Sequence, residues 1–455
     1  MAVVRSFSDA GLLAPLLVGL GVRMVVLAFG LGMDCTHDEC AYAELTRVLL
    51  DGHGVQPYGG HLWAPGYVSF LALHGLVVER FVDAAKLTQV LLSVASLALL
   101  YDLARSIFDR RIAALAAWIF ALYPTLIAFT HYLWPETLYI VLLLLSLRLA
   151  LEAGRAAADP GRALVPWAVA AGVALGATCH VKPLPLYFVP VLAVWLFVFF
   201  GRNVRAVTAG LLVAGTVALT LIPWTVHAYR QYGRAMIVEA TIGENLWRGN
   251  NHFLPPNADW GMPRPLEGGY PACKDANFVD QDRCNVGRAL GFVRGHPALF
   301  LRRVPFKLAD LWGPNSFLIR HLHFGLYGET PRVVVVALSA LTVASYAAVV
   351  VGAVLGLAFA VGGPNRSERV AWVWLVMLLV LYYCAVHALV FGMSRFRLPL
   401  MPLLFPFAAM AWTERRRLGE LRQRPAALAA IATVLLLFAA SWSGRWAPIW
   451  EFPAR

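Results

Sequence analysis

Long runs of apolar residues separated by short turns constrain this chain more than any other feature of its sequence. Residues 11–32 are almost wholly apolar, and about 20 such residues suffice to cross the hydrocarbon core of a bilayer. The composition agrees, because 60% of the 455 residues are hydrophobic, only 14% are charged and the mean hydropathy is +0.66. We therefore expect an all-α, polytopic membrane protein.

Further apolar segments have the length and hydropathy of membrane-spanning helices. Together with residues 11–32 they predict about 11 transmembrane helices, within a range of roughly 10 to 13. These further segments are residues 86–103, 112–130, 137–151, 165–181, 184–200, 206–224, 333–361, 371–391, 398–413 and 426–443.

The distribution of arginine and lysine predicts the orientation in the membrane, because cytoplasmic loops carry an excess of both. If the N-terminus is cytoplasmic, most loop arginines fall inside, and the short outside loops hold only Lys182, Arg395 and Arg397. We expect a bacterial inner-membrane protein whose first apolar segment stays as a signal anchor. The net charge of +12 then reflects topology and anionic headgroups, and its spread over many loops argues against nucleic-acid binding.

Two long loops, residues 33–85 and 225–332, interrupt the pattern of helices and short turns, and both are predicted to lie outside. We expect them to hold the chemistry or the recognition. The predicted organisation is therefore a membrane module over residues 1–224, a periplasmic loop over 225–332 and further membrane helices over 333–455.

Each long loop contains a segment that is too apolar for a free loop, at residues 65–78 and 290–312. We expect these segments to be helices in the plane of the interface, with Arg302, Arg303 and Lys307 facing headgroups.

Cysteines and histidines in the outside loops could form bridges or bind metal. An oxidising compartment would allow disulfides between Cys35 and Cys40 and between Cys273 and Cys284, although free thiols are the alternative because spacing does not guarantee geometry. We expect no metal site, because neither cysteine pair has zinc-site spacing. The histidines of the first long loop also lack a recognised ligand spacing: His37, His53, His61 and His74.

Asp38 and Glu39 place two adjacent carboxylates just after the first predicted span. A carboxylate can deprotonate an acceptor group, and burial beside a like charge lets two carboxylates divide the work. Adjacent side chains on a helix diverge by about 100°, so we expect one to be catalytic and the other structural. Tyr42, one turn later, shares the face of Asp38. The alternative is an acidic first turn that complements the helix dipole.

Glu136 is a further carboxylate, at the outer end of two spans joined by a very short loop. An ionisable residue there indicates function, although capping of the next helix is an alternative. Lys182 lies at the same surface, where it could hold a phosphate or extend toward the headgroups.

Arg395 and Arg397 lie at the outer start of a span, against the general charge asymmetry. Arginine binds phosphate in a bidentate manner, so this placement indicates an anionic partner, with interfacial placement as the alternative. Lys307 and Lys182 are weaker candidates for the same contact.

Several motifs, in this order, resemble the GT-C superfamily of membrane glycosyltransferases. Within it, the pattern is similar to the branch of protein O-mannosyltransferases and lipid A aminoarabinose (ArnT-like) transferases. The resemblance extends from the first span to about residue 413. The motifs are Asp38-Glu39-Cys40-Ala41-Tyr42-Ala43-Glu44-Leu45, Ala64-Pro65-Gly66-Tyr67, Tyr123-Pro124, Pro135-Glu136-Thr137, Pro223-Trp224, Gly243-Glu244-Asn245-Leu246-Trp247-Arg248-Gly249-Asn250 and Arg395-Phe396-Arg397-Leu398-Pro399.

The resemblance implies transfer of a sugar from a polyprenyl-phosphate donor to a periplasmic or lipid acceptor, with inversion at the anomeric carbon and no required cofactor. It implies that Asp38 is the catalytic carboxylate, that Glu39 belongs to its motif and that Glu136 is the acidic residue at the turn between the third and fourth spans. Asp38, Glu39 and Glu136 are therefore the predicted catalytic residues. The substrate cavity would include Tyr42, Tyr67, Asn245 and Trp247. The expected partners are the donor lipid, the bilayer and a lipid, glycan or protein acceptor.

The chain departs from the family pattern at Leu62-Trp63-Ala64-Pro65, where aminoarabinose transferases often have a lysine before two prolines. Lys182, Lys307, Arg395 or Arg397 would have to replace that phosphate contact. The chain also ends soon after its last predicted span, which argues against a large oligosaccharyltransferase. A flippase or transporter of lipid-linked sugars and an O-antigen polymerase or ligase are the alternatives, and the lack of an internal repeat favours the enzyme over a transporter.

Overall fold

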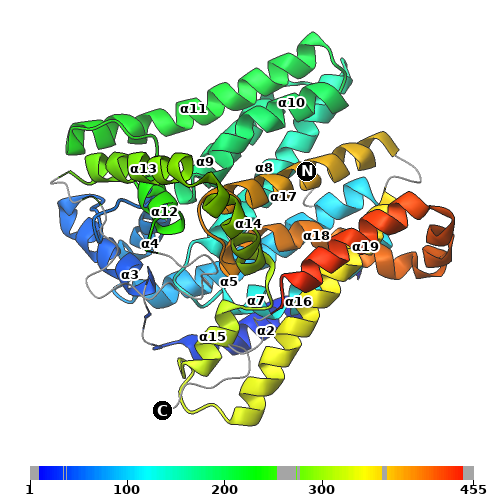
Figure 1. Cartoon of the computed structure of the whole chain (residues 1–455), viewed down its shortest axis with the longest axis horizontal. Helices are drawn as coiled ribbons and strands as arrows, with labels where there is room; N and C mark the ends of the chain where they lie inside the picture. The colour runs from blue at the N-terminus through cyan, green and yellow to red at the C-terminus, as the bar shows by residue number, and fades with distance from the viewer. Residues whose placement is uncertain are drawn as a thin grey trace.

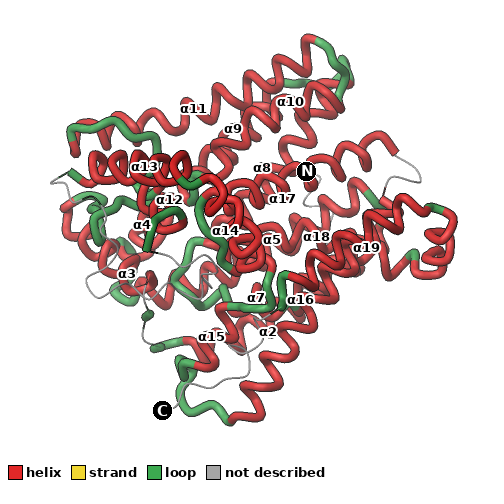
Figure 2. Tube along the Cα trace, in the orientation of Figure 1, coloured by secondary structure: helices red, strands yellow, loops and turns green. Residues whose placement is uncertain are grey.

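The computed structural model describes residues 10–33, 35–36, 38–253, 273, 277–360 and 366–443, and these form an almost wholly helical molecule (Figures 1 and 2). Over this part of the chain the backbone forms no strand beyond two isolated β-bridges. The elements, with η for a 3-10 or π segment, are α2 (Ala10–Gly30), α3 (Asp38–Val48), η1 (Leu49–His53), α4 (Pro65–Gly75), α5 (Phe81–Ile107), α6 (Arg110–Leu122), α7 (Pro124–Ala128), α8 (Glu136–Ala158), α9 (Val165–Val181), η2 (Leu184–Phe188), α10 (Val189–Phe199), α11 (Val204–Tyr232), α12 (Ile242–Gly249), α13 (Phe278–Gly295), α14 (Pro297–Trp312), α15 (Phe317–His323), α16 (Arg332–Ala360), α17 (Arg366–Leu389), η3 (Ser394–Leu400), α18 (Met401–Thr413), η4 (Arg415–Gln423) and α19 (Pro425–Ala440).

The apolar helices confirm the predicted all-α, polytopic membrane fold. Seven of the described helices are long and apolar enough to cross a membrane, and η4 with α19 gives an eighth if that bent pair counts as one span. Two shorter apolar helices, Val165–Val181 and Leu184–Phe199, lie beside them. Each of the predicted spans overlaps one helix or a pair of adjoining helices. The span predicted at residues 112–130 falls on α6 and α7, which belong to neither of these two groups of apolar helices.

One predicted span, residues 112–130, is not continuous, because it divides into α6 and α7 at Tyr123-Pro124. Proline lacks a backbone N–H and disfavours helical geometry in the residue before it. Tyr123 accordingly has φ −71° and ψ 112°, which is extended backbone.

The interior of the bundle is built around α5, α8 and the η3–α18 span. In their most apolar windows 61%, 72% and 83% of the residues are buried, whereas the share is only 33% in α2 and in α11. We infer that α2 and α11 turn much of their surface to lipid, while η3–α18 is held inside the protein. This central position matters because η3 carries Arg395 and Arg397.

The two long loops are joined at one end of the molecule, where α3, α4, α12 and α13 lie together (Figure 1). Leu62 and Ala240 form an antiparallel bridge, with N–O distances of 3.3 and 2.9 Å. The hydroxyl of Tyr232 donates to the carbonyl of Val55. The second loop is described only in part, because residues 254–272 and 274–276 lie outside the described residues.

The basic helix predicted at residues 290–312 is divided into α13 and α14 at Pro297. The prediction that its basic side chains all face headgroups is wrong. Arg302 is exposed, but Arg303 and Lys307 are buried and donate hydrogen bonds to the chain near Asn250. The presence of a basic side chain on an amphipathic helix does not show whether it will contact lipid headgroups or donate hydrogen bonds to protein carbonyl groups.

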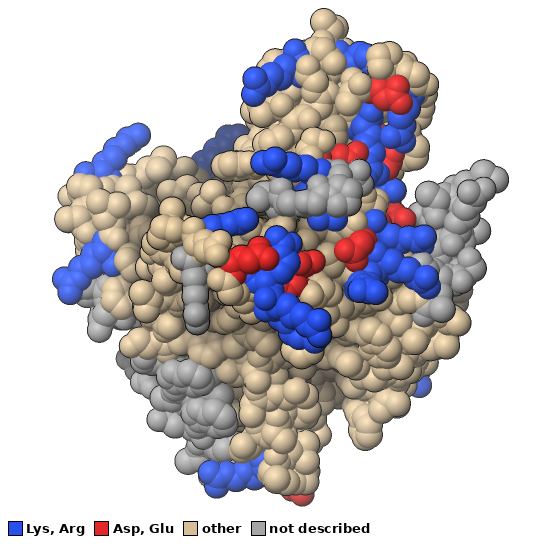
Figure 3. Space-filling view, turned by 90° about the vertical axis from the view of Figure 1, so that its right-hand side faces the viewer, with Lys and Arg blue, Asp and Glu red and all other residues tan. Residues whose placement is uncertain are grey.

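The opposite end of the molecule carries the arginine-rich turns. The first residues of α11 and α17 and the turn between α18 and α19 lie on the right of Figure 1. Figure 3, which looks at that side, shows many lysine and arginine side chains with a few acidic ones among them. The turns to which the sequence assigns these arginines are therefore gathered at one end of the molecule.

Candidate active site

Asp38 is the first residue of α3 and contacts a residue from the far end of the sequence. Its Oδ2 accepts a hydrogen bond of 2.7 Å from Nη1 of Arg395. The structure pairs Cys35 with Cys40 in a disulfide, which ties the chain before α3 to the first turn of that helix. Asp38 therefore lies within a short segment that is closed by a disulfide.

Arg395 lies between aromatic rings at the start of η3. The guanidinium carbon is 5.1 Å from the ring centre of Trp134, 5.6 Å from that of Phe317 and 5.4 Å from that of Phe396. Such rings attract a cation but do not replace its hydrogen bonds. Nε of Arg395 is buried and meets no hydrogen-bond partner among the described residues.

Glu136 and Lys182 form a second ion pair nearby. Glu136 opens α8 and is fully buried, and its Oε1 accepts a hydrogen bond of 2.6 Å from Nζ of Lys182. Lys182 caps the end of α9, where Gly66 of α4 makes a close approach. A Cβ on Gly66 would lie 2.6 Å from the carbonyl oxygen of His180, so only glycine lets α4 pack against this end of α9.

The ring of Phe396 lies near one cation of each ion pair. The ammonium nitrogen of Lys182 is 5.9 Å from the centre of the Phe396 ring, and the guanidinium carbon of Arg395 is 5.4 Å from it. We call Asp38, Arg395, Glu136 and Lys182 the paired-charge cluster. Its members come from α3, η3, α8 and the end of α9, which are widely separated in sequence.

Tyr42 and Tyr67 adjoin this cluster, since both interact electrostatically with Glu136. Their rings meet edge to face with centres 4.9 Å apart, and Tyr42 also lies against Trp63 at 4.5 Å. Burial raises the pKa of Tyr42 well above its usual value, and the charges of Glu136, Arg395 and Asp38 act on it too. Tyr42 is therefore a neutral phenol beside the charged groups.

Glu39 is directed to a different environment from its neighbour Asp38. Its side chain is buried, and Oε1 has no hydrogen-bond partner within the described part of the chain. Burial raises the pKa of Glu39 to about 7, against the attraction of Lys86 on α5 and a hydrogen bond to Thr36, with Asp38 adding a smaller increase. The predicted divergence of the two carboxylates is thus what the structure has.

Two groups near the cluster gave no clear signal in the sequence. Arg320 on α15 interacts electrostatically with Arg395 and Asp38, and burial lowers its pKa. Glu239, beside the Leu62–Ala240 bridge, accepts a hydrogen bond of 2.6 Å from the hydroxyl of Thr241, and burial raises its pKa. Neither residue lies in an apolar segment or a recognisable motif.

Arg397 and Lys307, predicted as phosphate ligands, are engaged with backbone carbonyl groups. Arg397 donates to the carbonyl groups of Leu311 and Asn315 at 2.6 and 2.8 Å. Lys307 donates to Oδ1 of Asn250 at 3.0 Å and to the carbonyls at the end of α17. Burial and the charge of Arg303 lower the pKa of Lys307 to about 7. The structure does not bring these two cations to the cluster.

Asn245 and Trp247 lie on α12. Trp247 packs against Ala289 and Phe292 of α13, and the backbone N–H of Asn245 donates to Thr241 at 3.0 Å. Helix α12 is wedged in place, since a Cβ on Gly249 would lie 1.9 Å from the carbonyl oxygen of Val390.

The structure also pairs Cys273 with Cys284, which clips the chain to α13. Among the described residues, no group of three or more His, Cys, Asp or Glu side chains is arranged to hold a metal ion. His61 lies 2.9 Å from Glu244, and His74 is hydrogen-bonded to Thr88. His37 lies outside the described residues.

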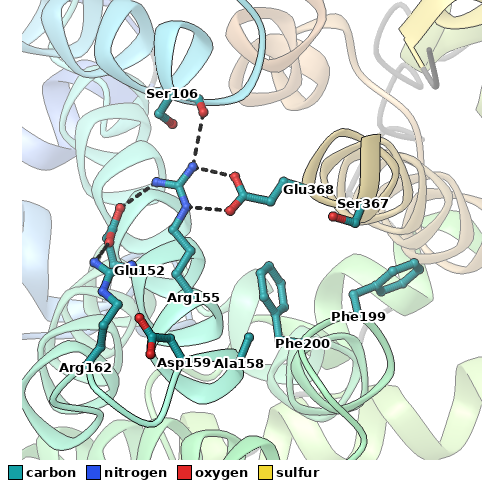
Figure 4. A pocket seen from close by; sticks show the side chains of 10 residues that line it. All are labelled: Ser106, Glu152, Arg155, Ala158, Asp159, Arg162, Phe199, Phe200, Ser367 and Glu368. Atoms are coloured by element: carbon teal, nitrogen blue, oxygen red, sulfur yellow. Dashed lines mark hydrogen bonds and ion pairs between the residues drawn. The ribbon is translucent and has the colours of Figure 1, made fainter. Parts of the chain in front are cut away.

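A cavity of about 560 Å³ occurs at the opposite, arginine-bearing end, between α8, α10 and α17 (Figure 4). Arg155 lies 2.6 Å from Glu368 and 2.7 Å from Glu152, which also contacts Arg162 at 2.6 Å. These charges neutralise one another, so we interpret them as ion pairs that hold α8 and α17 together. None of the predicted site residues lines this cavity.

Comparison with known proteins agrees with the fold. Residues 64–227, just over a third of the chain, match a family described as dolichyl-phosphate-mannose-protein mannosyltransferase. No curated protein is a significant match to the sequence. The matched region contains Tyr67, Glu136 and Lys182.

Solved structures give a wider match. The oligosaccharyltransferase of Archaeoglobus fulgidus in its apo form has a TM-score of 0.53 at 12% identity, over 99% of this chain and 57% of that one. Its complex with Zn and sulfate has a TM-score of 0.52 at 15% identity, over 96% and 53%. The present chain thus spans about half the length of that protein. ArnT from Cupriavidus metallidurans bound to undecaprenyl phosphate reaches only 0.37 at 15% identity, over 88% and 76%, which is too low to support an argument.

Proposed function

Because this chain is a polytopic membrane protein with the fold of the GT-C glycosyltransferases, we propose that it moves a sugar from a polyprenyl-phosphate-linked donor to an acceptor, with inversion at the anomeric carbon. The observation that carries the proposal is the paired-charge cluster. It places two cations near Phe396 and a carboxylate against each of them. Transfer from a phosphate-linked sugar needs a group that accepts a proton and a group that stabilises the phosphate that leaves.

In the proposed reaction, an acceptor hydroxyl or amine attacks the anomeric carbon while the bond from that carbon to the phosphate oxygen breaks. Asp38 orients the acceptor and takes its proton. Arg395 and Lys182 stabilise the charge that develops on the departing lipid phosphate, which is usually the largest electrostatic contribution to catalysis. A single displacement of this kind inverts the anomeric centre.

Glu136 and Glu39 act through other residues in this scheme. Glu136 holds the ammonium of Lys182 in place with a contact of 2.6 Å. Glu39 is buried next to Asp38 and supports the first turn of α3. No step of the proposed reaction requires a metal or an organic cofactor.

The cluster is proposed to face the periplasm of a bacterial inner membrane, with a cytoplasmic N-terminus. Both disulfides belong to the long loops, and disulfides persist in oxidising compartments. The arginine-rich turns at the other end fit the cytoplasmic side. The donor would enter from the bilayer, and the acceptor would be a lipid, a glycan or a protein, with no role for nucleic acid.

Purified protein in detergent, supplied with polyprenyl-phosphate sugars that carry different labelled sugar groups, tests the proposal. We expect transfer of label to an acceptor without any membrane gradient, and the same rate after chelation of divalent cations. Movement of the intact lipid-linked sugar across vesicles, with no transfer in detergent, would show a transporter instead.

A further inference from the structure

The pairing of Asp38 with Arg395 creates a conflict within the proposed mechanism. The same guanidinium that is proposed to meet the donor phosphate is already hydrogen-bonded to the proposed base. An arginine next to a carboxylate stabilises the charged form of that carboxylate, which makes the carboxylate a weaker proton acceptor. Asp38, held by Arg395, is therefore poorly prepared for proton removal.

We propose that Arg395 is an exchangeable partner: Asp38 occupies it in the empty site, and the donor phosphate displaces Asp38 from it. This inference rests on the proposed function, because it takes the donor to be a lipid-linked phosphate. It also sets the order of events in the reaction. The donor binds first and releases Asp38 from Arg395, and the acceptor then binds next to the released Asp38.

The surroundings of Arg395 support an exchange. Arginine offers five N–H donors, yet Arg395 uses one of them on Asp38, and its buried Nε has no partner among the described residues. A phosphate can accept two parallel hydrogen bonds from a guanidinium. The phosphate would thus make at least as many contacts as the single carboxylate contact that it replaces.

The aromatic rings around Arg395 make a counter-charge necessary at every stage. Trp134, Phe317 and Phe396 lie within 5.6 Å of the guanidinium and limit its contact with water. An ion in such surroundings is costly unless an opposite charge is next to it. Asp38 fills that role before the donor binds, and the phosphate fills it afterwards.

A second cation, Arg320, can compensate the charge of Asp38 after the exchange. The electrostatic interaction of Asp38 with Arg320 of α15 would keep its charge compensated after Arg395 turns to the phosphate. Lys182, whose ammonium nitrogen lies 5.9 Å from the centre of the Phe396 ring, offers a second cation to the same phosphate. The exchange therefore leaves no charge without an opposite charge nearby.

Competition for one guanidinium makes an unusual prediction about affinity. Binding of a polyprenyl monophosphate without sugar should become about tenfold tighter or more in Asp38→Asn, since a charged hydrogen bond that opposes binding is lost. Turnover in the same variant should fall. The matched control is Asp51→Asn, which removes the same charge from an exposed residue of the same loop and should leave the affinity unchanged.

A double-mutant cycle separates competition from simple repulsion between Asp38 and the phosphate. Competition predicts that Asp38→Asn no longer tightens binding in an Arg395→Gln background, whereas repulsion predicts the same tightening in both backgrounds. Size-exclusion chromatography and thermal unfolding identify any variant that fails to fold, in which case Asp38→Ser replaces Asp38→Asn.

The possible failures are distinguishable. If the wild-type protein does not bind the polyprenyl monophosphate, both the proposed donor and the exchange are wrong. If it binds but Asp38→Asn leaves the affinity unchanged or weaker, or if tightening persists without Arg395, the exchange is wrong while the proposed transfer stands.

Discussion

Lys182 neutralises a carboxylate that has no access to solvent, since its ammonium nitrogen lies 2.6 Å from Oε1 of the fully buried Glu136. Removal of one partner of a buried pair leaves an uncompensated charge. We expect Lys182→Met to lower the free energy of unfolding by about 3 to 5 kcal/mol. Denaturant unfolding of the purified protein measures this loss.

The double variant Lys182→Met with Glu136→Gln is the control for that experiment. It removes both charges and should recover most of the stability, although not the activity. A single variant as stable as the wild type would mean that the contact between Glu136 and Lys182 does not form.

Asp38→Asn tests the proposed base directly. The amide keeps the shape of the side chain but cannot take a proton. We expect the transfer rate to fall by about two to four orders of magnitude, the usual contribution of a positioned acid or base. The rate of Asp51→Asn should stay at the wild-type level. A folded Asp38→Asn protein that turns over normally would remove Asp38 from the catalytic role.

Glu39 should make the stability of the protein depend on pH. The pKa of Glu39 is about 7 in the folded protein, above the 4.5 of an unfolded glutamate. The contribution of Glu39 to the free energy of unfolding is therefore full below pH 4.5 and is lost as the pH rises to about 7. The loss is about 3 kcal/mol, from 1.36 kcal/mol for each pKa unit.

Glu39→Gln tests this dependence by unfolding at several pH values. The variant should gain on the wild type between pH 5 and pH 8, whereas Glu44→Gln, at an exposed position of the same helix, should follow the wild type throughout. Parallel curves for Glu39→Gln and the wild type would show that Glu39 titrates normally.

Arg397 is expected to contribute to stability and not to donor binding, because its guanidinium is hydrogen-bonded to the carbonyl groups of Leu311 and Asn315. Arg397→Gln should lower the free energy of unfolding by about 3 to 6 kcal/mol, since two hydrogen bonds to a charged group are lost and each contributes about 1.5 to 3 kcal/mol. Arg416→Gln, at an exposed position, is the control. Lost affinity for the lipid phosphate with unchanged stability would return Arg397 to the donor site.

The proposed orientation can be tested with single cysteines in intact cells, after Cys179 and Cys384 are replaced by alanine. A membrane-impermeant maleimide should label Glu44→Cys on α3 from outside, and Arg416→Cys on η4 only after permeabilisation. Both positions are exposed in the structure. The opposite result would place the cluster in the cytoplasm and end the case for a periplasmic transferase.

The helices of this protein could be predicted from sequence because apolar length is a local property. The helix predicted at residues 165–181 is present as one helix. The helix predicted at residues 112–130 is present except for a break before Pro124. The surroundings of a charge are not local. Lys307 was predicted to face headgroups because its helix is basic, but carbonyl groups from α17 receive its ammonium.

The site was predictable in its residues but not in its pairs. Asp38, Glu136 and Arg395 stood out because charges are rare beside apolar spans. Nothing in the sequence indicated that Arg395 meets Asp38, 357 positions away. That contact depends on how η3 is held inside the bundle, which is decided by packing between elements that are distant in the chain.

The distance along the chain between Asp38 and Arg395 also has a consequence for biosynthesis. At about 5 to 20 residues per second, a ribosome needs roughly 20 to 70 seconds to make the 357 positions that separate them. During that interval the first turn of α3 has emerged without its arginine. The disulfide between Cys35 and Cys40 spans only five positions, so it can close in the nascent chain and hold this turn in shape until η3 is inserted.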